Sequence, residues 1–450
     1  MKQVISAKLK LHTTPEDFQA LRRTQLAYRD GLNAVSRYAY AHDKTSNNQQ
    51  LHQGMYAALR ATYHLPSQLA CSVERQVAAT YKGLWTKVNK NAEARKAGMT
   101  KKRYKGLDQA PKFVSPTMQY TYERDYTFKS EHQVSLNTLE GRITLSYQGY
   151  APHLALIQHG ARIGDAKLWY DQAKKHFYLL VSLEIESADP TFESHKQVIG
   201  VDVGIRYLAV TSTSTGQTSF YTGKRVRHQA NHYARLRKRL QQKGTRWATR
   251  RLRRIAQRER RLKQQANHTV SKHIVNTHPQ SLIGLEQLSD IRERMKRRTR
   301  RRKKTGKGTE PVSPKARKAN RVYSQWSFAE VQSMIAYKAV LSGSMAIKVD
   351  ANYSSQACPK CGWTSDANRP KHGLLFQCQN CHYELHADVV GARNITLRTL
   401  LLRQDWGKTG HLSVAPDASG KEAKALRLQR YSELRWSPEA SPSRSTGRGD

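Results

Sequence analysis

Three acidic residues that could bind a metal ion stand at the edges of apolar segments far apart in the sequence. Asp202 ends the run Val198-Ile-Gly-Val-Asp202, and Glu286 ends Ser281-Leu-Ile-Gly-Leu-Glu286. Asp388 opens an apolar helix candidate, where aspartate is also a common N-cap. A buried carboxylate must be paired or bound to a metal, so core packing explains this recurrence poorly.

Three carboxylates on separate elements suit the hydrolysis of a phosphodiester. Two Mg²⁺ ions held by acidic side chains can act on the attacking oxygen and on the leaving oxygen. Mg²⁺ takes oxygen ligands and keeps several waters, so Asp202, Glu286 and Asp388 would be enough to hold a pair. Asp350, at the end of the strand candidate 345–350, could be a fourth ligand, but a turn residue is the preferred interpretation.

Four of the five cysteines form a second candidate centre. Cys358-Pro-Lys-Cys361 and Cys378-Gln-Asn-Cys381 are two Cys-x-x-Cys pairs separated by 16 residues. This spacing predicts a tetrahedral zinc site, and four thiolates leave no open position for water. We therefore expect the zinc to be structural, because small ribbons of this kind fold around their metal.

The overall charge predicts a polyanionic partner. The 450 residues include 78 Lys and Arg against 34 Asp and Glu, a formal net charge of +44. A membrane surface is the alternative, and it is disfavoured because the sequence has no long apolar span and its basic runs lack an apolar face. The N-terminus lacks the core of a signal peptide and the cysteines are clustered, so we expect an intracellular protein.

Two segments concentrate the positive charge. Residues 231–265 are a helix candidate with 14 Lys or Arg and one acid, Glu259, and residues 292–304 contain ten Lys or Arg in thirteen positions. A solvated helix and a disordered linker would explain them, but a helix of one charge sign repels itself unless an anion lies against it. We predict phosphate contacts from both segments, made by Arg250, Arg251, Arg254, Arg297, Arg298 and Arg301.

The remaining pattern predicts the elements that position these groups. Residues 1–12 alternate as one strand, Thr14 and Pro15 begin a helix as its N-cap and first residue, and a second helix begins after Ser67. Cys71 on that helix is interpreted as a buried thiol. From 113 to 190 the pattern is β, with a hairpin at 171–175, so a helical unit is inserted into a β-domain.

Several motifs resemble those of the TnpB proteins of insertion sequences. Ile199-Gly-Val-Asp202-Val-Gly, Ile283-Gly-Leu-Glu286 and Asp388-Val-Val-Gly-Ala-Arg-Asn-Ile are similar to the three split RuvC motifs of an RNase H-like nuclease. The stretch from Tyr353-Ser-Ser through the two cysteine pairs resembles the family's zinc element, and Trp326-Ser-Phe and Tyr337-Lys-Ala resemble its helix. The specific match covers about residues 196–400. The chain departs from the family at Val390-Gly-Ala, where many relatives carry Asn-Ala-Ala.

The resemblance implies an α+β multidomain fold. A wedge β-barrel domain would comprise residues 1–12 and 112–195, with a helical recognition domain, 13–111, inserted in it. An RNase H-like RuvC α/β nuclease domain would comprise 196–350 and 386–404, with a zinc ribbon for target nucleic acid, 351–385, inserted in turn. Residues 405–450 lose apolar periodicity and are predicted to be a disordered tail.

The resemblance also implies an RNA-guided DNA endonuclease of an insertion sequence, related to the type V CRISPR effectors. Asp202, Glu286 and Asp388 would hold catalytic Mg²⁺, and the one zinc would be held by Cys358, Cys361, Cys378 and Cys381. The implied partners are a guide RNA from the transposon end and target double-stranded DNA, without a membrane. The implied state is a monomer with RNA in the prokaryotic cytoplasm, at the nucleoid.

Three other functions were weighed against this one. A guide-RNA-dependent regulator that binds DNA without cutting it would be expected to have a broken set of carboxylates, whereas all three are present here. An RNA-independent, structure-specific nuclease would also use the basic surface. A transposase proper ranks last, because no Tyr or His-hydrophobic-His pattern is convincingly placed for strand transfer.

Overall fold

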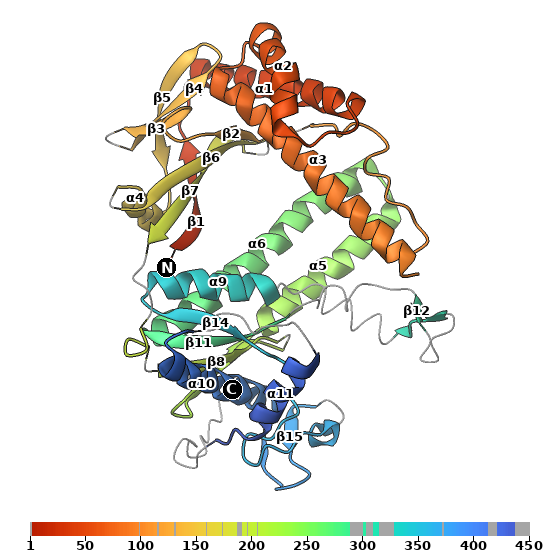
Figure 1. Ribbon diagram of the computed structural model, residues 1–450, viewed down its shortest axis with the longest axis vertical. Helices are drawn as coiled ribbons and strands as arrows, with labels where there is room; N and C mark the ends of the chain where they lie inside the picture. Colours follow the sequence, from red (N-terminus) through yellow and green to blue (C-terminus); the bar gives the residue numbers. More distant parts are fainter. Residues whose placement is uncertain are drawn as a thin grey trace. The chain divides into compact units, whose positions relative to one another are not determined.

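The computed structural model describes residues 2–436 except 99, 115–116, 130–131, 159, 173, 187–190, 196, 205, 289–299, 303–308, 315–327, 371–372 and 413–420. The chain divides into two compact units, Lys2–Glu186 and Ser187–Asp450, which are described separately. Figure 1 gives the order of the elements along the chain.

The first unit is built on a seven-stranded sheet with the order β2-β6-β7-β1-β5-β4-β3. The N-terminal strand, β1 (Lys2–Leu11), is confirmed and lies in the middle, antiparallel to β7 over its whole length. The predicted hairpin near 171–175 is also confirmed, because β6 and β7 pair up to Asp171 and His176. The other strands are β2 (Met118–Tyr120), β3 (Tyr126–Lys129), β4 (Gln133–Thr138), β5 (Gly141–Gln148), β6 (Arg162–Asp171) and β7 (His176–Glu186).

This sheet is curled until it is nearly closed, which corresponds to the barrel that we expected. The hydroxyl of Tyr126 on β3 donates to the carbonyl of Gly164 on β6 at 2.5 Å. The hydroxyl of Tyr120 on β2 donates to the carbonyl of Asn137 on β4 at 2.8 Å. These tyrosines lie at opposite ends of the strand order, so their hydrogen bonds join the two ends across the inside of the curl.

The helical insert holds three long helices, one of which was not predicted. α1 (Pro15–Ala41) begins as expected, because Thr14 is its N-cap in a capping box with Asp17 and Pro15 is its first residue. α3 (Ser67–Lys96) also begins where it was expected. Between them lies α2 (Asn48–Tyr63), which buries only Leu51 and Leu59 and therefore has a weak apolar signature. The short helix α4 (Ala151–Gln158) lies between β5 and β6.

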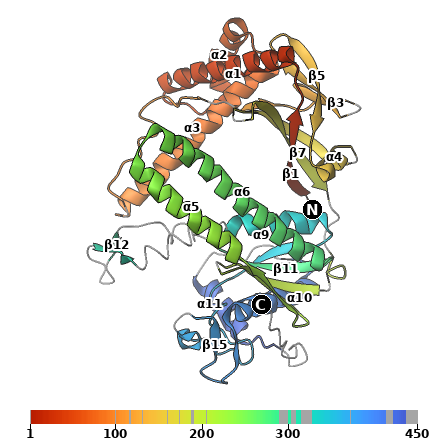
Figure 2. The same ribbon diagram turned by 180° about the vertical axis from the view of Figure 1, so that it is seen from behind.

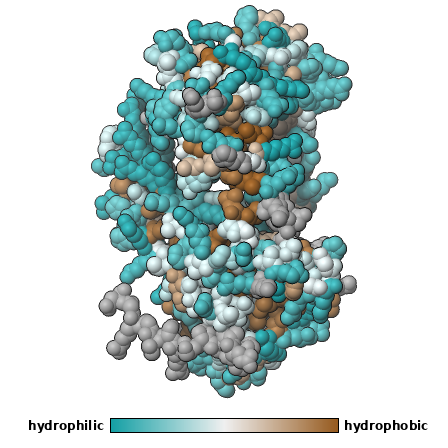
Figure 3. All heavy atoms as spheres, turned by 90° about the vertical axis from the view of Figure 1, so that its left-hand side faces the viewer, coloured by the Kyte–Doolittle hydropathy of each residue, from teal (hydrophilic) through white to brown (hydrophobic). Residues whose placement is uncertain are grey.

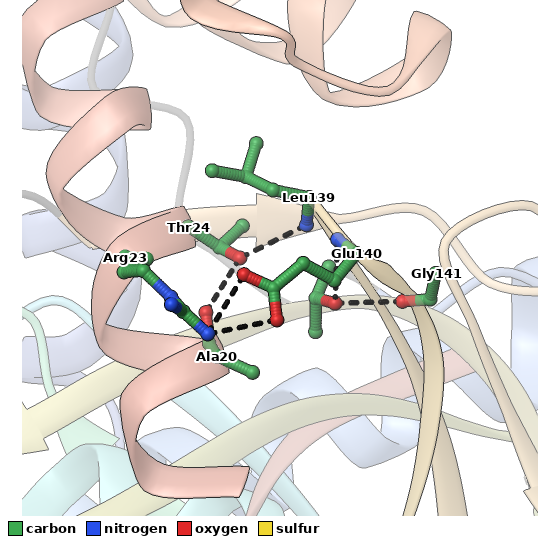
Figure 4. A network of polar contacts seen from close by, with 7 residues as sticks. Ala20, Arg23, Thr24, Leu139, Glu140 and Gly141 are labelled. Atoms are coloured by element: carbon green, nitrogen blue, oxygen red, sulfur yellow. Dashed lines mark hydrogen bonds and ion pairs between the residues drawn. The ribbon is translucent and has the colours of Figure 1, made fainter. Parts of the chain in front are cut away.

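A polar network ties α1 to the turn between β4 and β5 (Figure 4). The hydroxyl of Thr24 accepts the backbone N–H of Leu139 at 3.1 Å and donates to the carbonyl of Ala20 at 2.8 Å. Beside it, Arg23 forms an ion pair with Glu140 at 2.8 Å. Thr24 is fully buried, so this contact holds the insert against the sheet.

The second unit contains a five-stranded sheet with the order β10-β9-β8-β11-β14, covered by helices on both faces (Figures 1 and 2). The predicted hairpin at Asp202 is confirmed, because β8 (Gln197–Asp202) and β9 (Tyr207–Thr213) are antiparallel neighbours. β8, β11 (Ser281–Glu286) and β14 (Met345–Val349) run parallel, and β10 (Thr218–Thr222) forms one edge. α6 and α9 (Phe328–Leu341) pack on one face, and α10 (Ala387–Thr409) packs on the other.

The basic helix predicted at 231–265 is two antiparallel helices, so its continuity was predicted wrongly (Figure 2). α5 (Lys224–Lys243) ends at Gly244, which has a left-handed φ of 63°, and Thr245 caps α6 (Arg246–Thr277) through the N–H of Ala248. The acid Glu259 is buried between them, where it pairs with Arg237 of α5 and with Lys263 at 2.9 Å. Trp247, the second residue of α6, is 62% exposed.

The predicted disordered tail differs from the structure over its described residues. α10 continues to Thr409, and a further helix, α11 (Lys421–Ser432), precedes a buried Trp436. Short strands β12 (Arg300–Arg302) and β13 (Thr309–Pro311) pair with each other, and β15 (Leu375–Gln377) pairs with β16 (Glu384–His386). No helix within the described part of the chain is long and apolar enough to cross a membrane. Hydrophilic residues are widespread on the face drawn in Figure 3.

Candidate active site and cysteine centre

Asp202 and Glu286 lie side by side at the carboxyl ends of two parallel strands. β8 and β11 are neighbours, with Val201 opposite Leu285, and the next residue on each strand is the acid. Because side chains alternate along a strand, each acid shares a face with the glycine two positions before it. That face is covered by α10.

The two glycines allow α10 to approach the strands closely. A Cβ on Gly200 would lie 2.3 Å from the carbonyl oxygen of Ala392 and 2.3 Å from the nitrogen of Thr396. A Cβ on Gly284 would lie 1.9 Å from Oγ1 of Thr399. The Gly-x-acid pattern of both motifs therefore has a packing cause: the glycine admits the helix that carries the third acid.

Asp388 lies in the first turn of α10 but does not cap it. His386 is the N-cap, and its Nδ1 accepts the backbone N–H of Asp388 at 3.2 Å. The cap interpretation of Asp388 is therefore wrong, and its carboxylate is available for other contacts. One turn further on, a Cβ on Gly391 would lie 2.8 Å from Oδ2 of Asp202, so Gly391 leaves the room that the Asp202 carboxylate occupies.

The charges of the three acids interact. Burial raises the pKa of Asp202 well above its usual range, and the carboxylates of Glu286 and then Asp388 raise it further, while Arg369 opposes them. Burial also raises the pKa of Glu286, against the opposing effects of Ser354 and Arg398. A buried carboxylate whose ionisation is disfavoured by two neighbouring carboxylates lies where a cation would be stabilising.

Residues that sequence analysis did not select hold this site in place. Ser354 Oγ donates to Glu286 Oε1 at 3.0 Å, and the Asn394 amide of α10 donates to the Ser354 carbonyl at 2.7 Å. Gln332 of α9 donates to the Glu286 carbonyl at 2.8 Å. Arg369 Nη2 lies 3.7 Å from Asp388 Oδ1. The only signal for Ser354 in the sequence was its place in the Tyr353-Ser-Ser motif.

Asp350 takes the turn role that was preferred for it. Its Oδ1 accepts the backbone N–H of Asn352 at 2.9 Å, directly after β14. The guanidinium of Arg398, which is buried in α10, donates to the carbonyl of Asp350 and to that of Asn352. Asp350 thus ends a third parallel strand beside Glu286, but its carboxylate folds back on its own turn.

The four cysteines come together in two matching turns. In the first, the Cys358 N–H donates to the Trp363 carbonyl at 2.9 Å, and the Gly362 N–H donates to the Cys358 carbonyl at 2.8 Å. In the second, the Cys378 N–H donates to the Tyr383 carbonyl and the His382 N–H donates to the Cys378 carbonyl, both at 3.0 Å. Gly362 and His382, which follow the last cysteine of each pair, both have positive φ. The two Cys-x-x-Cys pairs therefore form equivalent knuckles.

The sulfur atoms of these knuckles are arranged to hold one metal ion. Sγ of Cys358 lies 3.7 Å from Sγ of Cys381, Sγ of Cys361 lies 3.5 Å from Sγ of Cys378, and all four lie within 4.8 Å of one another. Burial disfavours the Cys361 thiolate, but the Trp363 backbone and the Asn380 amide outweigh it, and the pKa of Cys361 falls to about 7. Four sulfur ligands at this spacing fit a metal such as zinc.

The three carboxylates are spread more widely than these sulfurs. Within the described parts of the chain, only the four cysteines and one other group have all their ligand atoms within 4.8 Å, and the acids are not among them. Two ions about 4 Å apart can be held by side chains that do not all reach the same ion.

The C-terminal segment covers α10 and the first knuckle. The Trp436 N–H donates to the carbonyl of Pro359 at 2.7 Å, and its ring lies 5.1 Å from the Arg393 guanidinium. Tyr431 of α11 lies under Arg398, 4.4 Å away. Two buried arginines of α10 thus face aromatic rings of a segment that was predicted to be a tail.

The arginines proposed to contact nucleic acid divide into two groups. Arg250, Arg251 and Arg254 are exposed on α6. Arg301 lies in the strand β12, and only its backbone is described. Arg297 and Arg298 lie outside the described residues, as do Trp326 and Ser327 of the helix motif.

Two family models match parts of the chain that hold these sites. Residues 181–289, which include Asp202 and Glu286, match the OrfB_IS605 model, described as "Probable transposase". Residues 328–395, which include the four cysteines and Asp388, match the "Cas12f1-like, TNB domain" model. Together the two matches contain every proposed metal ligand of the second unit.

Two curated relatives are similar over about half of the chain. The "CRISPR-associated endodeoxyribonuclease Cas12f1" of Sulfoacidibacillus thermotolerans is 25% identical over 254 residues, 52% of this chain. The "Putative RNA-guided DNA endonuclease InsQ" of Escherichia coli (strain K12) is 26% identical over 230 residues, 49% of this chain. The chain spans about half the length of these relatives, 53% of each.

Among solved structures, CasPhi-2 (Cas12j) bound to crRNA superposes with a TM-score of 0.49 and 12% identity, covering 89% of this chain and 98% of that one. The sequence matches cover the carboxylate motifs and the cysteine pairs themselves. Taken with the two relatives, they support the similarity of this chain to the TnpB family.

Proposed function

We propose that this protein is an RNA-guided DNA endonuclease of an insertion sequence, with Asp202, Glu286 and Asp388 as its catalytic metal ligands. The observation that carries the proposal is the electrostatic interaction of Asp202 with both other acids. The names of the two relatives, an endodeoxyribonuclease and an RNA-guided DNA endonuclease, support the same activity. The guide RNA, the target DNA and a monomeric complex with RNA belong to this proposal.

The residues around the acids fit a Mg²⁺-dependent centre. A pair of Mg²⁺ ions would neutralise the scissile phosphate and activate a water molecule. Ser354 holds the Glu286 carboxylate in one orientation, and Arg369 offsets part of the negative charge at Asp388. Oxygen ligands alone line the centre, and this is the ligand set that Mg²⁺ selects.

The four cysteines are proposed to hold one structural Zn²⁺. A site with four thiolates has no position for a reacting water, so the metal would stabilise the ribbon and would take no part in hydrolysis. The ribbon begins at the turn that carries Ser354, and it ends at His386, the cap of α10. Folding of the ribbon around zinc would therefore position groups on both sides of the carboxylates.

The domain roles follow the same proposal. Residues 196–350 and 386–404 would form the RuvC nuclease domain, and residues 351–385 the zinc ribbon. The curled sheet with its helical insert would be the wedge and recognition domains. The exposed arginines of α6 would lie along nucleic-acid phosphates. Residues 246–265 contain one acid, Glu259, which is buried and paired with Arg237, and Trp247 is 62% exposed.

The test compares two aspartates at neighbouring strand ends. The protein is purified with the RNA that accompanies it, and that RNA is sequenced to design a matched plasmid target. Asp202→Ala should abolish Mg²⁺-dependent cleavage and keep RNA binding. Asp350→Asn, which alters the acid whose Oδ1 accepts the N–H of Asn352 after β14, should keep cleavage. Unchanged cutting by Asp202→Ala would refute the site.

The same experiment separates the other functions. RNA-guided binding by the wild-type protein without metal-dependent cleavage would indicate a regulator. Cleavage of branched DNA by a preparation free of RNA would indicate a structure-specific nuclease.

A further inference from the structure

A second group of metal-ligand side chains lies in the first unit, between α2 and α3. His52 is on α2, and Cys71 and Glu74 are three residues apart on α3, so they share one face of that helix. A ring nitrogen of His52, Sγ of Cys71 and a carboxylate oxygen of Glu74 all lie within 4.8 Å of one another. Cys71 was predicted to be a buried thiol. This prediction is wrong, because Cys71 is only partly buried.

The Glu74 carboxylate is the unusual member of this group. Its residue is 0% exposed, and its Oε2 lies 2.8 Å from Nδ1 of His52, whereas its Oε1 has no hydrogen-bond partner. A buried carboxylate oxygen without a partner is destabilising, because it has lost its water. Neighbouring Arg75 directs its hydrogen bonds to the Cys71 carbonyl and to Ser72 Oγ instead.

We propose that His52, Cys71 and Glu74 form a binding site for a divalent transition-metal ion of the zinc type. Imidazole, thiolate and carboxylate are all zinc ligands. Ligand atoms around a tetrahedral zinc ion lie roughly 3.3–3.7 Å apart, so the group needs only small side-chain adjustments to close on one. The proposal is independent of the nuclease function.

The charge and proton balance of this site is favourable. The metal ion takes the place of the proton between His52 and Glu74, and the Cys71 thiol releases its proton on binding. One thiolate and one carboxylate then neutralise the two charges of the ion, and Arg75 remains beside them as a cation. The His52 side chain is 45% exposed, which leaves a path for the ion and for a water as fourth ligand.

A bound ion would join two helices that share little apolar surface. α2 buries only two residues, Leu51 and Leu59. A metal ion bound by His52 and by residues of α3 would therefore supply much of the interaction that holds α2 against α3. Without metal, these residues have only the 2.8 Å contact between His52 Nδ1 and Glu74 Oε2. The site with metal and the site without it can be distinguished at Cys71, which is a metal-bound thiolate in the first and a free thiol in the second.

The first test counts zinc in the full-length protein after equilibration with zinc chloride and removal of free metal. Wild type should carry one zinc more per chain than His52→Gln or Cys71→Ser. His42→Gln, a change at the end of α1 outside the group, should carry as much as wild type. Cys358→Ser should keep the zinc that His52→Gln loses. Equal zinc in wild type, His52→Gln and Cys71→Ser would overturn the proposal.

The second test needs no variant to fold well. Alkylation of Cys71 by iodoacetamide is followed by peptide mass spectrometry with and without added zinc. Zinc should slow the alkylation of Cys71 in the wild type by ~10-fold or more, by analogy with the losses of affinity seen when metal sites are perturbed. It should have little effect on Cys71 in His52→Gln. Alkylation at the same rate with and without zinc in the wild type would overturn the proposal and leave only the contact between His52 and Glu74.

Discussion

Gly200 of β8 donates its backbone N–H to Oγ1 of Thr396 on α10 at 3.0 Å. The same hydroxyl donates to the Ser212 carbonyl or to the Ala392 carbonyl, at 2.8 and 2.9 Å. The helix can reach the strand only because position 200 has no side chain. This contact brings the first turn of α10, with Asp388, to the carboxyl ends of β8 and β11.

Replacement of Gly200 by alanine should therefore destabilise the second unit. The added methyl group would meet backbone atoms of Ala392 and Thr396, which cannot rotate away, and overpacking of this kind costs about 1–3 kcal/mol. The change is measured as the shift of the urea unfolding midpoint. Gly83→Ala is the control: it lies on an exposed part of α3 with nothing within 4 Å and should stabilise its helix by about 0.5–1 kcal/mol. Equal midpoints for Gly200→Ala and wild type would contradict the packing argument.

Loss of the Ser354 hydroxyl should impair the proposed nuclease centre more than the fold. Ser354→Ala removes the 3.0 Å hydrogen bond that holds Oε1 of Glu286. Partners that orient metal ligands are worth ~10-fold or more in metal affinity or activity. We expect slower cleavage and a higher Mg²⁺ concentration at half-maximal rate, with Ser354→Thr restoring part of both. An unchanged Mg²⁺ midpoint in Ser354→Ala would exclude this positioning role.

The α6 arginines should determine part of the salt dependence of RNA binding. A variant with glutamine at Arg250, Arg251 and Arg254 removes three exposed charges from one helix. If each contacts a phosphate, the slope of log affinity against log salt should fall by about 2–3. The same three positions changed to lysine are the control, because lysine neutralises a phosphate as well. An unchanged slope in the glutamine variant would show that the RNA phosphates do not contact these three arginines.

Lys338 should make the stability of the second unit depend on alkaline pH. Burial, and then the charge of Lys272, lowers its pKa from 10.5 to about 8. Between those values the unfolded chain binds more protons than the folded chain, so this residue's contribution to stability rises with pH from about 8 to 10.5. Lys338 also donates to the His268 carbonyl and to Ser271 Oγ, both at 2.7 Å.

The comparison for this prediction is with Lys338→Met, which does not titrate. The difference in unfolding free energy between wild type and variant should move in favour of the wild type as the pH rises from 7 to 10. Using the difference cancels the other groups that titrate in this range. A constant difference would show that Lys338 keeps an ordinary pKa in the fold.

Local sequence was enough to predict several elements of this protein. The capping of α1 by Thr14, the hairpin at Asp202 and the Cys-x-x-Cys turns each depend on residues a few positions apart. Their signals are complete within one turn or one strand pair. The failures were local too: Gly244 and Thr245 carried the signal that separates α5 from α6, and the apolar pattern of the surrounding helix was given more weight.

Other features depend on contacts that no local pattern contains. α2 has only two buried residues, and α11 and Trp436 are ordered against Arg393, Arg398 and Pro359 of distant segments. The choice of His386 over Asp388 as the cap of α10 was equally beyond reach, because the two residues are only two positions apart and only the folded chain shows that the helix begins at Ala387 and that His386 accepts the N–H of Asp388.

The residue types and their spacing alone determined that this protein has three acids at the edges of apolar segments, four cysteines spaced to bind a metal, and a formal net charge of +44. Only the tertiary structure decided that β8 and β11 are parallel neighbours, that Gly200 and Gly284 admit α10, and that Ser354 faces Glu286. It alone placed His52 beside Cys71 and Glu74. The physical reason is that spacing along the chain sets the direction of each side chain within its own element, whereas the neighbours of that element are selected by packing between residues far apart in sequence.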